Sequence, residues 1–130
     1  MAQKQTKTTQ EIAGLLRRFD DQPDPLHNDV TPSVLRLMEL GLAGAEAVLD
    51  LLNSPELIRR RRAQRVLEGV VARRFGWNSS QGYPDEASRE KALALLKQNG
   101  DYRADAAAAY RHGAIRKWEQ WLRAHQKEEK

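Results

Sequence analysis

Apolar residues recur every three or four positions along most of the chain, and glycine or proline falls where each such run ends. This spacing places the apolar residues on one face of an α-helix, whereas the alternation typical of a half-buried strand is almost absent. The pattern therefore predicts an all-α fold of about six helices. Their expected ranges are residues 8–19, 31–40, 44–52, 55–75, 85–99 and 103–125.

Several helix ends carry local signals. Thr8 and Glu11 have the spacing of a capping box, in which each side chain accepts from a backbone N–H of the first turn. Thr31 precedes Pro32, a pair typical of an N-cap followed by the first helical position, and Gly41 supplies a left-handed stop. The connections between the second, third and fourth helices are short, which favours antiparallel neighbours.

The fourth predicted helix contains four consecutive arginines, at residues 59–62. Four successive residues of a helix cannot share one face, because each is turned by about 100° from the last. Arg59 and Arg60 flank the inward stripe on opposite sides, so both are predicted to belong to the framework. We expect Arg61, Arg62 and Arg65 to be solvated. The inward stripe consists of Ala63, Val66, Leu67 and Val70, with Val71 beside it.

Two groups of aromatic residues have different expected roles. Trp118 and Trp121 lie on the apolar stripe of the last helix, which predicts that they are structural core residues. Trp77 follows the fourth helix in a loop, where it is either a lid on the core or, with Tyr83 nearby, an exposed anchor for a partner. The sequence leaves both interpretations of Trp77 open.

Residues 41–76, "GLAGAEAVLDLLNSPELIRRRRAQRVLEGVVARRFG", resemble a HEAT-like helical repeat. The shared features are a glycine-led first helix, a turn, and a second helix that opens with "LIR". The closing "AIRKWEQWLRAH" is similar to the tails of many bacterial HEAT-like domains. The resemblance implies a short α-α superhelical stack, for which an Armadillo-like or a simple α-bundle label stays open. It also implies that Arg59 holds Asp50, Asn53 or an acid of residues 20–29.

Length and composition fit one domain. A chain of 130 residues is long enough to bury a core of its own. We expect a HEAT-like domain over residues 8–125, with disordered tails at residues 1–7 and 126–130. No apolar run has the length of a membrane span or a signal peptide, and cysteine is absent, so we expect a soluble, cytoplasmic protein with no membrane partner.

The net charge of +4 conceals two segments of opposite sign. Residues 20–50 contain seven acidic residues and one arginine, whereas residues 54–77 contain seven arginines and two glutamates. Such neighbouring segments can bind charged partners, but they can also satisfy each other in space. We expect the internal pairing to account for most of this charge.

No motif for catalysis, metal binding or cofactor binding is present, so we expect no enzyme activity, no metal and no cofactor. The sequence favours a protein-interaction module, acting as a scaffold, adaptor or regulatory subunit with another protein as partner. Nucleic acid remains the alternative, since the arginines of the fourth helix could neutralise phosphates. The candidate partner-binding residues are Trp77, Tyr83, Arg61, Arg62, Arg65 and Arg73.

Overall fold

The computed structural model describes the backbone of residues 2–126 and the side chains of residues 8–126. This part of the chain is an all-α domain with six α-helices and no β-strand, as the periodicity predicts. The predicted C-terminal tail lies outside the described residues except for Gln126. The elements are α1 (Ala2–Arg17), α2 (Pro32–Glu39), α3 (Leu42–Ala47), the 3₁₀ helix η1 (Asp50–Asn53), α4 (Leu57–Arg74), α5 (Glu86–Gln98) and α6 (Ala108–His125).

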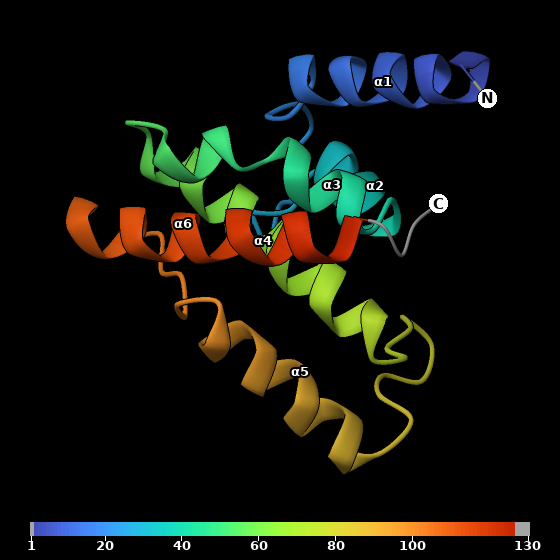
Figure 1. Cartoon of the computed structure of the whole chain (residues 1–130). Helices are drawn as coiled ribbons and strands as arrows, with labels where there is room; N and C mark the ends of the chain where they lie inside the picture. The colour runs from blue at the N-terminus through green and yellow to red at the C-terminus, as the bar shows by residue number, and fades with distance from the viewer. Residues whose placement is uncertain (1, 127–130) are drawn as a thin grey trace.

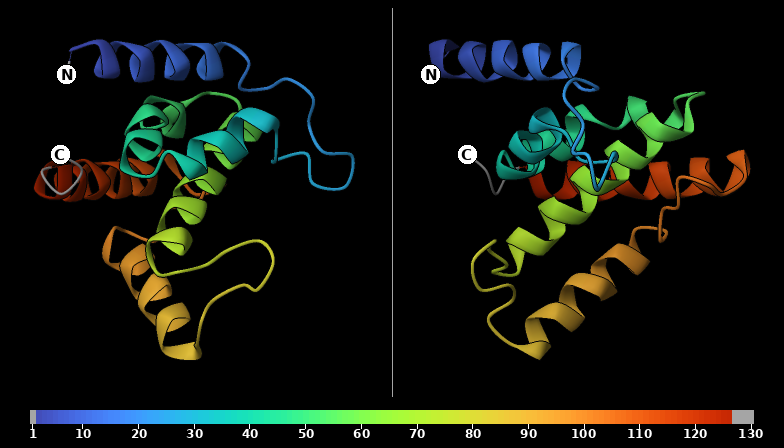
Figure 2. Two further views of the ribbon diagram at one scale, coloured as in Figure 1. Left: turned by 90° about the vertical axis from the view of Figure 1, so that its right-hand side faces the viewer. Right: turned by 180° about the vertical axis from the view of Figure 1, so that it is seen from behind.

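Helix α4 is the central element of the domain. It runs obliquely through the molecule and packs against α2, α3, η1 and α5, while α6 crosses it and α1 lies above the other helices (Figure 1). Figure 2 shows that the C-terminal part of α4, the following loop and α5 extend away from the other helices. The inward stripe of α4 is as predicted, since Ala63, Val66, Leu67, Val70 and Val71 are all buried.

Two glycines allow the helices around α2 to approach closely. A Cβ on Gly44 of α3 would lie 1.9 Å from the carbonyl oxygen of Leu37, and a Cβ on Gly69 of α4 would lie 2.4 Å from Met38 Sδ. Gly44 is therefore required by space, because it faces a backbone carbonyl, whereas at Gly69 the flexible Met38 side chain would have to shift. Gly41, between α2 and α3, has the positive φ predicted for it, 67°, with ψ −132°, a conformation that favours glycine.

The structure corrects the first and third predicted helices. Helix α1 begins at Ala2, so Thr8 lies inside it and does not act as its N-cap. The predicted helix over residues 44–52 is broken into α3 and η1. At this break the backbone changes to tighter i→i+3 hydrogen bonds, for example from Leu51 N to Val48 O.

The last helix begins at Ala108, five residues later than predicted, because the preceding segment uses its backbone groups elsewhere. Ala104 donates its N–H to Gln64 Oε1 at 2.9 Å, and its carbonyl accepts from Arg60 Nε at 2.9 Å. The buried Tyr102 hydroxyl donates to Leu52 O at 2.6 Å. These three contacts tie the segment to α4 and η1, which prevents the regular hydrogen bonding of a helix.

Helix α6 contributes the largest side chains of the core. Trp118 is 1% exposed and Trp121 is 8% exposed, with their rings edge to face at 5.5 Å. The outer face of Trp121 is covered by polar groups, because His125 stacks on it at 4.3 Å and the Arg74 guanidinium lies 5.3 Å from its ring. Both tryptophans therefore have structural roles.

Gly44→Ala should lower the free energy of unfolding by about 1–3 kcal/mol, because the new Cβ forces α3 away from the backbone of α2. Gly113→Ala is the matched control, since a Cβ there meets nothing within 4 Å and alanine favours a helix more than glycine does. Urea unfolding of both variants checks the prediction. Equal stability of the two variants would show that the α2–α3 contact can relax without cost.

Candidate interaction surface

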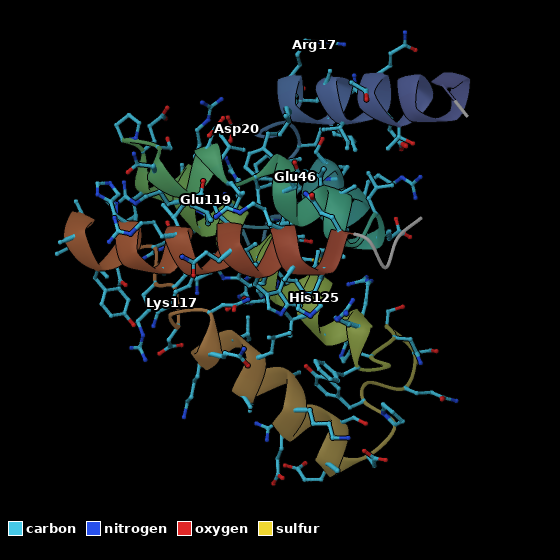
Figure 3. All side chains as sticks on the ribbon, viewed as in Figure 1. Arg17, Asp20, Glu46, Lys117, Glu119 and His125 are labelled. Atoms are coloured by element: carbon cyan, nitrogen blue, oxygen red, sulfur yellow. The ribbon has the colours of Figure 1, made fainter. Side chains whose placement is uncertain are left out.

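The arginine run meets the acidic loop at Asp20. Arg59 Nε donates to Asp20 Oδ2 and Arg62 Nη1 donates to Asp20 Oδ1, both at 2.7 Å. Asp20 lies where the chain leaves α1, close above the body of the domain (Figure 3). One carboxylate therefore serves two guanidinium groups. Arg62 also donates from Nε to the carbonyl oxygen of Asn28 at 3.0 Å, at the far end of the loop.

The assignment of Arg62 to the solvated side of α4 is wrong. Its side chain is only 8% exposed, whereas that of Arg59, predicted as framework, is 38% exposed. Arg62 precedes Val66 by four residues and so lies on the same face of the helix. The acidic loop covers this face, which removes Arg62 from solvent and makes it unsuitable for binding a partner.

The two arginines favour the charged form of the Asp20 carboxylate. Partial burial would raise the pKa of Asp20, but the hydrogen bonds from Arg59 and Arg62 outweigh burial and hold that pKa below its ordinary value. The carboxylate and its two partners therefore form a charged, hydrogen-bonded cluster, which we call the Asp20 clasp.

Two further arginines of α4 also have internal partners. Arg60 donates to two backbone carbonyls, those of Ala104 at 2.9 Å and Ser54 at 2.8 Å. Arg65, predicted as solvated, is 46% exposed but pairs with Asp29 at 2.7 Å and with Glu68 at 3.3 Å. Within the described part of the chain, Arg61 is exposed and forms no ion pair.

The loop that carries Asp20 is held at both ends and projects between them. The clasp holds its start, and the contacts of Arg62 with Asn28 and of Arg65 with Asp29 hold its end. Residues 21–28 are all exposed, and the segment between α1 and α2 extends beyond the helices (Figure 2). Leu26 is 87% exposed within this loop.

Beside α4 lie two adjoining pockets, of about 350 Å³ and 270 Å³, which we call the α4 groove. They share Gln64, Glu68 and Asp105. Leu67, Leu96, Tyr102 and Trp118 line the larger one, and burial raises the pKa of Tyr102 to about 12, so its hydroxyl is neutral at ordinary pH. The charged lining consists of Asp29, Glu68, Asp101, Asp105, Arg61, Arg65 and Arg103.

Trp77, Tyr83 and Arg73 lie at the other end of α4. The Arg73 guanidinium is 5.0 Å from the Trp77 ring, and Trp77 is half-buried, while Tyr83 packs against the core. Twelve residues of α-helix separate Arg73 from Arg61, a distance of roughly 18 Å. The predicted partner-binding residues therefore do not form one site.

Sequence reasoning missed the acidic side of the α4 groove and the exposure of Leu26. Asp29, Glu68 and Asp105 come from three separate segments, and none of them belongs to a motif. Only the two prolines beside Leu26, which disfavour burial in a helix, could have indicated that this leucine lies on a projecting loop.

Comparisons with known proteins gave no match to a family model, a curated protein or a solved structure. Among the described residues, no helix is long and apolar enough to cross a membrane. The same residues contain no group of three or more histidine, aspartate or glutamate side chains arranged to hold a metal ion.

Asp20→Asn should lower the free energy of unfolding by about 1–3 kcal/mol at neutral pH, because the buried Arg62 loses its counter-charge. The folded pKa of Asp20 lies below the unfolded value of 3.8. The charged Asp20 therefore contributes fully to the free energy of unfolding at pH values above its unfolded pKa. This contribution is lost as the pH falls through its folded pKa. Urea unfolding at neutral pH and at about pH 3 should show the difference between wild type and variant shrinking in acid.

Asp21→Asn is the control, since Asp21 is exposed and should change stability little at either pH. A constant difference between wild type and Asp20→Asn across this pH range would mean that the charge of Asp20 does not stabilise the fold.

Proposed function

We propose that this protein is a non-catalytic interaction module that binds another protein, as a scaffold, adaptor or regulatory subunit. The surface that we assign to binding is the α4 groove. We also propose that the helices form a short HEAT-like stack. It is supported by the resemblance of residues 41–76 and by the packing of α3 and η1 against α4.

The observation that carries the proposal is the internal pairing of the arginine run. A binder of the phosphate backbone needs guanidinium groups that reach solvent and exchange counterions for phosphates. Arg59 and Arg62 instead bind Asp20, and Arg60 binds two carbonyls. Together with Arg65, which pairs with Asp29 and Glu68, four of the seven arginines of residues 54–77 thus donate to oxygen acceptors within the domain.

The chemistry of the α4 groove also favours a protein partner. Four carboxylates and three guanidinium groups line it. The carboxylates would repel a polyanion, whereas a protein surface with charges of both signs can complement such a lining. The partly buried Leu96 adds apolar area to the larger pocket, whereas Leu67 and Trp118, which also line it, are each only 1% exposed.

The test uses the full chain as bait in native lysate treated with nuclease. We expect wild type to retain protein partners after this treatment. Asp105→Lys should lose them, because it reverses an exposed charge on the groove. Glu90→Lys is the matched control, since it makes the same change on the exposed side of α5 and should retain the partners.

Nucleic-acid binding predicts a different result. Retention would then disappear with nuclease, and affinity for a 20-base-pair duplex would fall log-linearly with salt and fall further in Arg61→Gln. Tight duplex binding at physiological salt, together with loss of protein partners on nuclease treatment, would overturn the proposal.

A further inference from the structure

We infer that the projecting loop of residues 21–28 is a docking element whose Leu26 side chain inserts into an apolar pocket with a basic rim on a partner protein. This inference rests on the proposed function and names a second contact surface, separate from the α4 groove.

Leu26 is exceptional among the apolar side chains of the domain. It is 87% exposed, whereas the other exposed large apolar side chains, Leu35, Leu57, Leu93 and Tyr110, are between 38% and 46% exposed. Single exposed leucines are common on proteins, so exposure alone would not indicate a site. What distinguishes Leu26 is that it lies on a loop with hydrogen bonds of its own and with ion pairs at its base.

The loop is fixed from within and at its base. Asp24 Oδ1 accepts from the backbone N–H groups of Leu26 at 2.8 Å and of His27 at 3.0 Å. Asp24 N donates to Val30 O, and Val30 N donates to His27 O, both at 2.9 Å. The Asp20 clasp and the Arg65–Asp29 pair hold the base on α4. A loop ordered before binding loses little entropy when it docks.

The charges around Leu26 indicate the chemistry of the partner. Asp21 and Asp24 are exposed in the same loop. Asp24 lies 3.7 Å from His27 Nδ1 and accepts two backbone N–H groups, and among the described residues neither carboxylate has an arginine or lysine partner. Both ends of this loop already bind arginines of α4, through Asp20 and Asp29. A partner with arginine or lysine around an apolar pocket would complement the exposed tip in the same way.

The experiment compares three full-length baits in nuclease-treated native lysate: wild type, Leu26→Ser and Leu93→Ser. Leu93 is the matched control, an exposed leucine at 42% on α5. Both variants should melt like wild type, because neither side chain belongs to the core. Each protein retained by wild type is then purified, and its Kd for all three chains is measured by isothermal titration calorimetry.

We expect at least one retained protein for which Leu26→Ser weakens binding roughly tenfold or more, while Leu93→Ser has little effect. Asp21→Asn should weaken the same complex less, by a factor that shrinks as salt is added. Equal Kd values for the three chains would overturn the role of Leu26 and leave the proposed function standing. Retention of no protein by any bait would overturn both.

Two other results would also overturn this inference. If retention depended on nucleic acid, then a nucleic acid and not a protein would be the partner. Wild type could instead self-associate with increasing concentration in sedimentation velocity, while Leu26→Ser does not. The loop would then bind a second copy of this chain.

Discussion

The Asp20 clasp is the interaction on which the rest of the structure depends. Arg62 is 8% exposed, and a buried guanidinium is strongly unfavourable unless charged and polar acceptors surround it. Asp20 and the Asn28 carbonyl supply those acceptors from the two ends of one loop. The same residues bring the end of α1 onto the body of the domain. Phe19, next to Asp20, is 1% exposed, and its carbonyl accepts from Thr31 Oγ1 at 2.8 Å.

The clasp also gives part of the basic run partners within the domain. The acidic segment that precedes α4 in the chain folds back over it, so that charges of opposite sign are paired within the domain. What remains accessible is a groove with charges of both signs and a projecting loop with a leucine at its tip. These two features provide the surfaces that we propose for a partner.

The parts of the fold that depend on local signals could be predicted from the sequence. Thr31 caps α2 through a hydrogen bond from Val34 N, and Asp85 caps α5 in the same way. The inward stripe of α4 follows from its periodicity alone. Arg62 could not be assigned in this way, because a helical wheel does not show which distant segment covers a given face.

The start of α6 and the candidate surfaces depend on tertiary contacts. Residues 103–107 are rich in alanine and favour a helix, but Gln64 and Arg60 bind the backbone of Ala104 and keep this segment irregular. The α4 groove combines side chains from the acidic loop, α4 and the segment before α6, which are distant in sequence. No pattern within any one of these segments indicates that they meet.

A double-mutant cycle between Asp20 and Arg62 tests the central claim most directly. The free energy of unfolding in urea is measured for wild type, Asp20→Asn, Arg62→Gln and the double variant at neutral pH. If the clasp organises the domain, the double variant should be less destabilised than the sum of the single variants by about 1–3 kcal/mol, since the two residues share one interaction. Additive effects within about 0.3 kcal/mol would contradict the claim, because residues that do not interact give no coupling energy.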